Sequence, residues 1–351
     1  MGQLDEFGGW SSTLNTLIAG RDLASGVVAA MLGEILSGEA TAAQIAAVLV
    51  ALRAKGETAS ELSAMLDVVL KVSQRVELSA SLRDAAVDIV GTGGDGSHSI
   101  NISTMAAIVA AGAGVPVCKH GNRAASSSCG TADVLEALGV RIDLDPAGVA
   151  ACVAEAGIGF CFAPSFHPAF RFAAPARREI GVPTAFNLLG PMANPGGVTR
   201  MVIGVADPTR ADLVLDTLAA RGTEHAWVVH GGGLDELTTT GPSEVHALRR
   251  GEVKTFSVDP TGLGLATPSA ADLVGGDPAH NAAAVRAVLS GEVGPHRDIV
   301  ILNAAAALVV ADRAIDLAEG LELAVASIDS GSAAATLENL ISVSNRDGLD
   351  V

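Results

Sequence analysis

Three short stretches of this sequence carry residues suited to binding anionic oxygens. They are the glycine turn Gly91-Thr92-Gly93-Gly94-Asp95-Gly96, the stretch Asn101-Ile102-Ser103-Thr104, and the run from Lys119 to Ser127. Each offers backbone N–H groups, hydroxyls or a cation where a helix should begin or a strand should end, and oriented N–H groups free of bulky side chains bind anions. Because the three lie within about forty residues and are separated by apolar, strand-like runs, they indicate a ligand with several phosphates.

Each stretch also has a simpler interpretation. The glycine turn matches the G-x-G-x-x-G fingerprint of dinucleotide sites, but that pattern alone is weak. No acidic residue lies between positions 97 and 123 to hold a ribose, and the turn lacks the lysine of a P-loop. The turn could be purely structural, and Ser103 and Thr104 could only cap a helix. Lys119 and the small residues after it are harder to explain in this way, because such a loop is typical of phosphate binding.

The overall charge places a condition on such a ligand. The chain has 351 residues and a formal net charge of −17, with only 22 lysines and arginines. This balance argues against nucleic acid as a partner and also disfavours a bare anionic substrate, so that divalent cations would have to mediate. Asp235 and Glu236, which follow a triple glycine, could hold Mg²⁺ bound to a diphosphate, or could form a solvated turn. The scattered histidines, among them His120 and His167, lack the spacing of a zinc site.

The elements around these stretches follow the rhythm of an open parallel α/β sheet. Apolar runs predict strands that precede the polar stretches, and helices begin after them. The expected strands cover 87–90, 115–118, 158–162, 198–205 and 226–229, the expected helices cover 104–111, 131–138, 208–220 and most of 279–343, and 245–258 should form an antiparallel hairpin. In such sheets ligands bind at the carboxyl ends of strands, where we expect Lys119 and the other polar residues to lie.

The N-terminal region has a different periodicity and carries no residues that suggest chemistry. From Leu14 to about Gln74, apolar residues recur at helical spacing and predict three helices, two of them opened by capping boxes at 41–44 and 58–61. Prolines bracket residues 166–195, which we expect to form a helical excursion. The fold class is therefore α/β, with a small helical N-terminal domain and a large α/β domain built on a mostly parallel central sheet.

Composition also bears on location. No apolar run reaches the ~18 residues of a transmembrane helix without interruption, and the N-terminus lacks a signal peptide pattern. The four cysteines show no C-x-x-C pairing, which predicts free thiols in a reducing compartment. We therefore expect a cytoplasmic protein with no membrane partner.

Taken together, the motifs resemble those of the anthranilate phosphoribosyltransferase family of tryptophan biosynthesis. The motifs that carry the resemblance are the glycine turn, Asn101 to Thr104, Lys119 to Arg123, Gly130 to Gly139, Phe186 to Pro191 and Asp235-Glu236-Leu237. The resemblance runs over nearly the whole chain. It implies that phosphoribosyl pyrophosphate (PRPP) donates ribose 5-phosphate to the amine of anthranilate, with release of pyrophosphate and with two Mg²⁺ ions per subunit.

The resemblance also implies site residues, position by position. Those implied to contact PRPP are Gly91, Gly94, Asp95, Ser99, Asn101, Ile102, Ser103, Thr104, Lys119, His120, Gly121, Asn122, Arg123, Ala124, Ala125, Ser126, Ser127 and Thr131. Those implied for anthranilate are Gly91, His120, Asn122 and Arg177, and those implied for the metal are Ser103, Asp235 and Glu236. Lys119, Asn122 and Arg177 would act by positioning and electrostatics, and no residue is assigned as an acid–base catalyst.

The family's organisation would divide the chain into two domains. Residues 1–83 would form the helical domain, joined by 166–195, and residues 84–165 with 196–351 would form the phosphoribosyl-binding domain. A homodimer through the helical domain is expected, since that domain has spare apolar faces. Two other functions stay open, a nucleoside phosphorylase of the same fold and a non-catalytic nucleic-acid-binding relative, which would need a basic groove.

Overall fold

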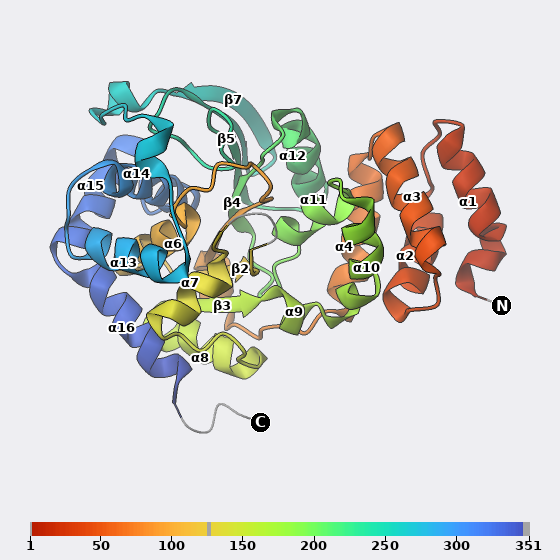
Figure 1. The fold of residues 1–351 in the computed structure, drawn as a ribbon, viewed down its shortest axis with the longest axis horizontal. Helices are drawn as coiled ribbons and strands as arrows, with labels where there is room; N and C mark the ends of the chain where they lie inside the picture. The colour runs from red at the N-terminus through yellow and green to blue at the C-terminus, as the bar shows by residue number, and fades with distance from the viewer. Residues whose placement is uncertain (1, 125–127, 347–351) are drawn as a thin grey trace.

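The N-terminal part of the chain is a bundle of helices whose ends are set by local sequence. The computed structural model describes residues 2–124 and 128–346. The first helices are η1 (Gln3–Phe7), α1 (Gly9–Ile18), α2 (Ser25–Ser37), α3 (Ala42–Lys55), α4 (Ala59–Val72) and α5 (Ala80–Ala85) (Figure 1). Both expected capping boxes form, one between Thr41 and Gln44 and one between Thr58 and Glu61. The three expected helices are confirmed as α2, α3 and α4.

A seven-stranded sheet lies at the centre of the rest of the described chain. Its strands are β1 (Val87–Gly91), β2 (Val117–Gly121), β3 (Ile158–Phe162), β4 (Arg200–Gly204), β5 (His225–His230), β6 (Ser243–Arg249) and β7 (Glu252–Val258), in the order β3-β2-β1-β4-β5-β6-β7. The first five pair in parallel, and β6 and β7 form the expected antiparallel hairpin at one edge. The predicted α/β class with a mostly parallel sheet is confirmed.

The strand that carries Lys119 differs from the one expected. We expected a strand over 115–118 with Lys119 just beyond its end, whereas β2 continues to Gly121 and pairs with β3 over its whole length. Pro116 has no N–H to donate to a ladder, and its carbonyl accepts a hydrogen bond from Val87 N at 3.0 Å where β1 begins. Lys119 therefore lies inside the sheet, with 2 % of its surface exposed.

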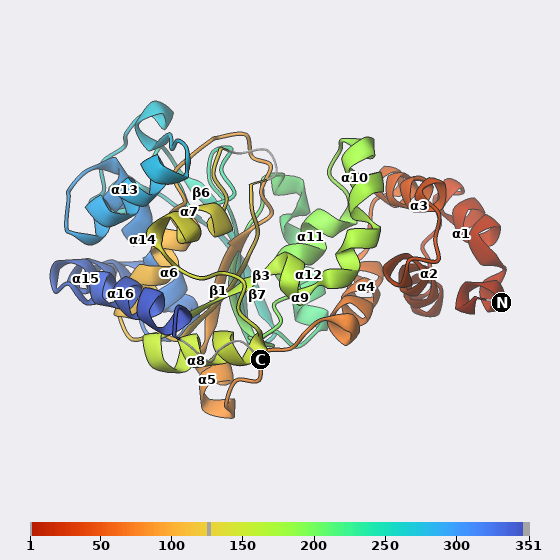
Figure 2. The same cartoon turned by 60° about the horizontal axis from the view of Figure 1, so that its bottom comes forward.

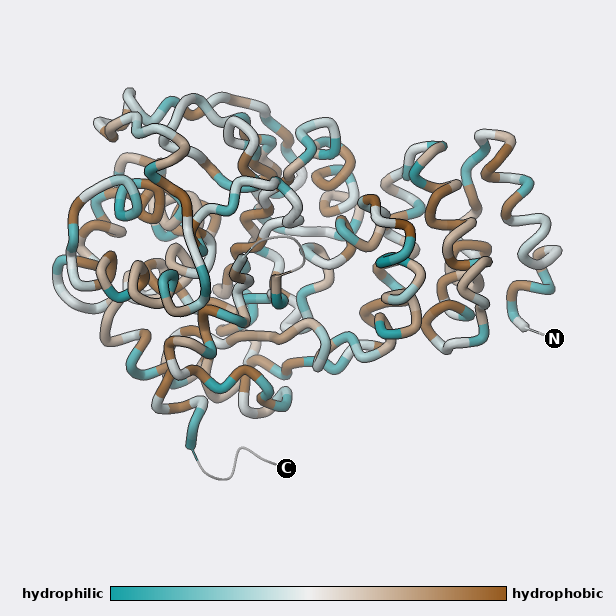
Figure 3. Tube along the Cα trace, viewed as in Figure 1, coloured by the Kyte–Doolittle hydropathy of each residue, from teal (hydrophilic) through white to brown (hydrophobic). Residues whose placement is uncertain are grey.

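Helices cover both faces of the sheet (Figures 1 and 2). α6 (Ile102–Gly112) and α14 (Pro295–Val310) pack against β1 and its neighbours, while α12 (Ala211–Ala220) packs against β5 and β6. The remaining helices of this part are α7 (Thr131–Leu138), α8 (Pro146–Ala156), α13 (Pro278–Leu289), α15 (Leu317–Asp329) and α16 (Ser332–Ser344), and short 3-10 turns lie at Pro208–Arg210 (η3), Pro260–Leu263 (η4) and Ala270–Leu273 (η5). Because aromatic residues are only 3 % of the chain, small and branched aliphatic side chains fill the core between these helices, and Figure 3 shows hydrophobic stretches along them.

Residues 163–192 return to the N-terminal helices, as expected for the proline-bracketed segment. They form α9 (Ala163–Phe166), η2 (Pro168–Phe172), α10 (Ala174–Ile180) and α11 (Ala185–Met192). α10 packs on α3 and α11 packs on α4, so this segment lies beside the bundle (Figure 2). We call η1 to α4 together with α9 to α11 the helical lobe, and the sheet with the other helices the α/β lobe.

Cysteines and apolar helices add two observations. Within the described ranges, no helix is both long and apolar enough to cross a membrane. Cys118, Cys129, Cys152 and Cys161 are all buried free thiols, as expected. Two of them, on neighbouring strands, have sulfur atoms 3.6 Å apart.

Gly91 and Gly204 are paired residues at the ends of β1 and β4, and neither has room for a side chain. A Cβ at Gly204 would collide with the backbone carbonyl of Asp235, and one at Gly91 would collide with the Asp235 carboxylate. We expect Gly204→Ala to lower the free energy of unfolding by about 1–3 kcal/mol, the usual cost of overpacking. Thermal denaturation checks this result.

The matched control is Gly33→Ala in α2, where nothing lies within 4 Å of the added Cβ. Alanine is the better helix former, so this variant should gain about 0.5–1 kcal/mol. Equal behaviour of the two variants would contradict the close approach of Asp235 to Gly204.

Candidate active site at the carboxyl ends of the strands

The polar stretches meet at the edge of the sheet where the parallel strands end. The glycine turn follows β1, the stretch from Asn101 begins α6, and the loop from Asn122 follows β2. Asp235 and Glu236, here called the acidic pair, follow β5, and hydrogen bonds join them to the first two stretches. The expected ligand-binding edge is therefore a connected polar cluster.

The glycine turn is folded around Asp235. Gly93 N donates to Asp235 Oδ2 at 2.7 Å. Gly93, Gly94 and Gly96 have φ angles of 66°, 81° and 70°, a region where other residues are strained. The carboxylate of Asp95 folds back onto the turn and accepts hydrogen bonds from the backbone and hydroxyl of Ser97 at 3.1 and 2.8 Å. The turn thus keeps bulky side chains away from its backbone N–H groups.

The first turn of α6 contacts the acidic pair. Asn101 is the N-cap residue, and its own side chain makes no capping hydrogen bond. Ser103 N instead donates to Glu236 Oε1 at 3.2 Å, and Thr104 Oγ1 lies 3.4 Å from Thr131 Oγ1. The capping interpretation of Ser103 and Thr104 is therefore wrong, and both face neighbouring site residues.

Other members of this stretch are held by the surrounding structure. Asn101 Nδ2 donates to Cys129 O at 3.1 Å, and Asn101 Oδ1 accepts from Asn281 Nδ2 at 2.8 Å. Ser99 forms a β-bridge to the segment before α13. The side chain of Ile102 is buried in the hydrophobic core, so Ile102 offers the site only its backbone.

Lys119 is a buried cation surrounded by oxygen atoms. Its Nζ donates to the carbonyl of Ile89 and, at 3.3 Å, to Ser103 Oγ. Burial lowers the pKa of Lys119, while the charges of Asp88 and of the acidic pair oppose that effect. An ammonium group has three donors, and within the described residues two of these have partners. Lys119 can therefore bind one further anionic oxygen.

The acidic pair is not a solvated turn, and that interpretation is wrong. Both side chains are half-buried and accept backbone hydrogen bonds. Burial raises the pKa of Asp235 to about 6, and repulsion by Asp95 adds to this effect. Burial and the charge of Asp235 raise the pKa of Glu236 to about 8, although Lys119 partly offsets the shift. A cation placed here would relieve the repulsion among these carboxylates.

The donor atoms of this cluster suit Mg²⁺. Carboxylate and hydroxyl oxygens are the hard donors that Mg²⁺ prefers. Ser103, whose backbone N donates to Glu236, also carries a hydroxyl group. In the described part of the chain, no three or more His, Cys, Asp and Glu residues are grouped so that they could hold a metal by themselves. Mg²⁺ commonly binds through one or two carboxylates together with water and phosphate oxygens, so the acidic pair fits this ion.

The residues directly after β2 are close to the strand ends. Gly121 ends β2, and a Cβ there would lie 2.9 Å from the ring of Phe160. Asn122 is exposed, and its Oδ1 accepts from Arg123 N at 2.7 Å. Three residues expected to contact PRPP, Ala125, Ser126 and Ser127, lie outside the described residues.

Arg123 is turned toward α7. Its guanidinium forms hydrogen bonds of 2.9 Å with Asp133 and 3.0 Å with Glu136, and these partners raise its pKa above the ordinary arginine value. The backbone N of Ala124 also donates to Asp133, at 3.0 Å. Arg123, which was predicted to bind phosphate, is in this structure hydrogen-bonded to protein carboxylates.

A run of ring contacts leads from β2 to α10. Ring centroids are 5.0 Å apart for His120 and His167, 5.2 Å for His167 and Phe170, and 5.1 Å for Phe170 and Phe186. The guanidinium of Arg177 lies 5.0 Å from the centroid of the Phe186 ring. The structure thereby connects His120 in the sheet to Arg177 in the helical lobe.

Arg177 is a half-buried cation that forms no ion pair with any described residue, and its ring contact is with Phe186. Burial lowers the pKa of Arg177, because no counter-charge compensates for the lost water. A guanidinium in this state is suited to the carboxylate of a ligand, which it can bind through two parallel hydrogen bonds.

Sequence reasoning missed Asp88, Asn194 and the ring contact of His167 with His120. Asp88 is fully buried and accepts from His120 N at 3.1 Å and from Asn194 Nδ2 at 2.7 Å. Burial raises the pKa of Asp88 to about 6. An acidic residue within the apolar strand β1 was a signal that could have found Asp88. Nothing in the spacing of Asn194 or His167 marks either residue.

Known proteins resemble this chain over nearly its whole length. Residues 83–334 match the glycosyl transferase family, a/b domain, and residues 11–73 match the helical bundle domain of the same family. The anthranilate phosphoribosyltransferase of Salinispora arenicola is 52% identical over 341 residues, which cover 96% of this chain and 97% of that protein. That of Xanthobacter autotrophicus is 50% identical over 334 residues, with 95% and 96% covered.

Solved structures agree with these matches. Anthranilate phosphoribosyltransferase from Thermus thermophilus has a TM-score of 0.90 and 39% identity, covering 95% of this chain and 99% of that one. The Saccharomyces cerevisiae enzyme in complex with PRPP and Mg has a TM-score of 0.85 and 28% identity, covering 95% and 97%. The chain therefore belongs to the glycosyl transferase family that joins a helical bundle domain to an α/β domain. Within that family it belongs with the anthranilate phosphoribosyltransferases.

The two buried histidines, which meet edge to face, make stability depend on pH. Burial lowers the pKa of His120 to about 3 and that of His167 to about 4, from an ordinary 6.5. Between these values and 6.5 the unfolded chain binds protons that the folded chain does not, so the free energy of unfolding falls as the pH is lowered through this range. We expect His167→Phe, which keeps a ring in the stack, to reduce that fall by up to about 1.4 kcal/mol per pH unit.

Urea unfolding at about pH 6.5 and about pH 4.5 measures this difference. His280→Gln, at an exposed position, is the control and should keep the slope of the wild type. A His167→Phe variant with an unchanged slope would show that His167 does not carry the pH dependence.

Proposed function

We propose that this protein transfers the 5-phosphoribosyl group of PRPP to the amine of anthranilate, giving N-(5-phosphoribosyl)anthranilate and pyrophosphate in tryptophan biosynthesis. One observation carries the proposal. A run of ring contacts leads from Arg177, which has no ion-pair partner among the described residues, to His120, the neighbour in β2 of Lys119, which lies with the acidic pair. The arginine suits an aromatic carboxylate, and the cluster suits a metal-bound diphosphate. Relatives support both parts, since Saccharomyces cerevisiae structures hold PRPP with Mg and 4-fluoroanthranilate.

The donor subsite would use the residues at the strand ends. We assign to PRPP the residues Gly91, Gly94, Asp95, Ser99, Asn101, Ile102, Ser103, Thr104, Lys119, His120, Gly121, Asn122, Arg123, Ala124 and Thr131, together with Ala125, Ser126 and Ser127. The uncovered N–H groups of the glycine turn and the remaining donor of Lys119 support this assignment. Lys119 would stabilise the charge that develops on the departing pyrophosphate.

The metal subsite would lie at the acidic pair. Ser103 and Glu236 would hold one Mg²⁺, and Asp235 and Glu236 a second. The raised pKa values of both carboxyl groups support a bound cation. When bound, the ions would neutralise the phosphates of the donor and lower the energy of the leaving group.

The acceptor subsite would lie between the lobes, at Gly91, His120, Asn122 and Arg177. Arg177 would hold the carboxylate of anthranilate, and Asn122 would orient its amine. An aromatic amine is uncharged at neutral pH, so its lone pair can form the C–N bond at C1 of the ribose while the C–O bond to pyrophosphate breaks. The nitrogen, now positively charged and acidic, then loses one proton to water. No strong base is needed, and orientation of the two reactants supplies much of the acceleration.

We also infer the organisation of the chain. Residues 1–83 with 166–195 would form the helical domain, and 84–165 with 196–351 the phosphoribosyl-binding domain. Exposed Phe7, Ile18 and Val50 on η1, α1 and α3 support a homodimer through the helical domain, which light scattering would test. The buried free thiols support a cytoplasmic location.

The direct test is loss of anthranilate fluorescence when the protein is mixed with PRPP, Mg²⁺ and anthranilate. A decrease that requires all three reagents is the expected result. Fluorescence that stays constant, together with phosphorolysis of a nucleoside by the same preparation, would replace this function with that of a nucleoside phosphorylase.

Arg177→Ala should raise the KM for anthranilate roughly ten- to a hundredfold, because a charge-assisted hydrogen bond to the substrate is lost. The KM for PRPP should change little. Arg178→Ala removes the exposed neighbouring arginine and serves as the control. Equal increases of both KM values in Arg177→Ala would remove this residue from the acceptor subsite.

Asp235→Asn combined with Glu236→Gln should abolish Mg²⁺-dependent turnover, because neutral amides bind Mg²⁺ far less well than carboxylates. Initial rates over a Mg²⁺ titration measure the effect, and circular dichroism shows whether the variant is folded. A folded variant with wild-type metal dependence would show that the acidic pair does not bind the ion.

A further inference from the structure

Two ion pairs link the lobes at opposite ends of α12. Just before the helix, Arg210 NH1 lies 2.9 Å from Glu57 Oε2, in the turn between α3 and α4. Just after it, Arg221 NH1 lies 2.7 Å from Asp67 Oδ1 on α4. The side chain of Glu57 is 1% exposed and that of Asp67 is 71% exposed. The two links thus have similar geometry but opposite environments.

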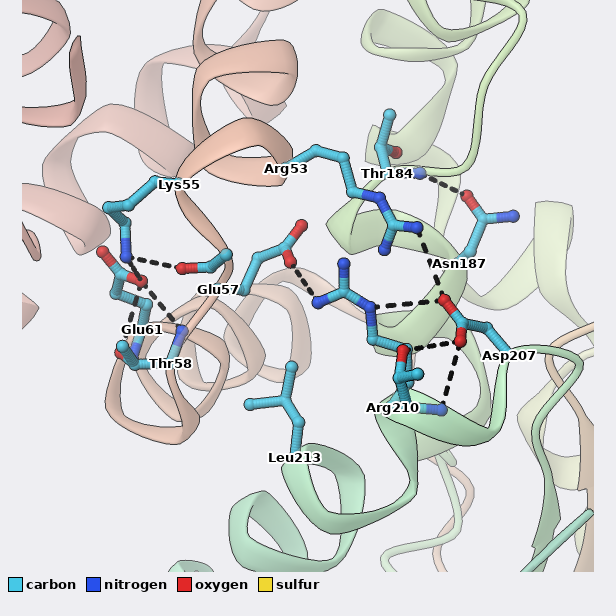
Figure 4. Close-up of polar contacts among 12 residues, drawn as sticks. Arg53, Lys55, Glu57, Thr58, Glu61, Thr184, Asn187, Asp207, Arg210 and Leu213 are labelled. Atoms are coloured by element: carbon cyan, nitrogen blue, oxygen red, sulfur yellow. Dashed lines mark hydrogen bonds and ion pairs between the residues drawn. The ribbon is translucent and has the colours of Figure 1, made fainter. Parts of the chain in front are cut away.

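The buried link is part of a row of four alternating charges (Figure 4). Arg53 NH2 lies 3.5 Å from Asp207 Oδ2, which is 3.7 Å from Arg210 Nε. Arg53 and Glu57, at the two ends of the row, belong to α3 and the turn after it, whereas Asp207 and Arg210 follow β4. The row therefore attaches the end of α3 to the α/β lobe at two points.

The Glu57–Arg210 pair is incompletely satisfied. Glu57 Oε1 and Arg210 Nε are both buried and have no hydrogen-bond partner in the described part of the chain. Removing two charges from water offsets most of their attraction, so a buried pair of this kind contributes little net stability. A contact that is costly to bury and only partly bonded indicates a role in orientation.

The pair is connected to elements of both proposed subsites. On one side, Ala206 N donates to Thr92 Oγ1 at 3.1 Å, and Thr92 N donates to Gly204 O at 2.9 Å, so the segment that carries Arg210 is bonded to the glycine turn. On the other side, α3 packs against α10, the helix that carries Arg177. Bonded and packed residues therefore connect the glycine turn to Arg177 through the Glu57–Arg210 contact.

We propose that Glu57 and Arg210 are positioning residues, whose buried ion pair fixes the position of Arg177 relative to the glycine turn. The proposal rests on the proposed function for the identity of the two subsites. The pair lies outside both subsites, so its loss changes their relative placement and leaves each one chemically intact. The KM for anthranilate then rises, whereas PRPP, bound within the α/β lobe, is little affected.

The test is Glu57→Gln, which removes the charge and keeps the shape of the side chain. We expect the KM for anthranilate to rise roughly five- to tenfold, in the lower range of coupling between sites, with the KM for PRPP unchanged. Asp67→Asn removes the exposed ion pair between the same lobes, while Arg221 NH1 still donates to Ser63 O at 3.0 Å, and should change either KM by no more than about twofold. The double variant Glu57→Gln with Arg210→Gln should have a KM for anthranilate no higher than that of either single variant. Either substitution alone already breaks the ion pair, so the second has no ion pair left to remove.

Hydrogen exchange gives a readout that does not depend on turnover. Amides of α10 should exchange faster in Glu57→Gln than in the wild type and in Asp67→Asn. Equal increases in both KM values, additive effects in the double variant, or unchanged exchange in α10 would each overturn the proposal. If the wild type did not consume anthranilate, the proposed function would fail, and the exchange of α10 would still decide whether the pair positions that helix.

Discussion

The close approach of Asp235 to the ends of β1 and β4 is the constraint on which the site depends. Two facing glycines, Gly91 and Gly204, leave the space that Asp235 fills. From there the carboxylate binds Gly93 N, and the next residue reaches Ser103 N at the start of α6. Strand ends, glycine turn and helix start are thus tied together through two adjacent acids.

The distribution of cations follows from the acidity of the chain. The chain has a net charge of −17, and half-buried basic side chains such as Lys55 and Arg210 contact carboxylates. Arg200, at the other end of β4, contacts both Asp312 and Glu224. Arg177 has no such contact with a described residue, and Lys119 retains a donor. Unlike the exposed basic residues that lack an ion pair, Arg177 and Lys119 are shielded from water, which makes them candidates for binding an anionic ligand.

The sequence predicted the architecture well because local rules decide it. Capping boxes at Thr41 and Thr58, the apolar runs of the strands and the glycine turn are local patterns, and they appear where expected except for β2, which is displaced from 115–118 to Val117–Gly121. The position of Lys119 within β2 was missed because pairing with β3, a long-range interaction, sets where that strand ends.

The site was predicted less completely, for the same reason. The motifs on which the family resemblance rests pointed to the residues at the strand ends. The structure brings several of these residues into contact. The edge-to-face contact of His167 with His120 and the hydrogen bond from Asn194 to Asp88 join residues far apart in the chain. No periodicity or spacing encodes such contacts, because they arise only when the helical lobe and the sheet have packed.

The two carboxylates that hold Arg123 have a consequence for selectivity. A phosphate that binds this guanidinium through both terminal nitrogens must displace Asp133 or Glu136 from NH1, so one anion replaces another. Such an exchange yields little net free energy unless the incoming anion has a higher charge than the carboxylate and also matches the planar fork of the arginine. Chloride does neither and a simple carboxylate only matches the fork, whereas a phosphate dianion does both. Asp133 and Glu136 would thus compete for Arg123 and exclude chloride and simple carboxylates.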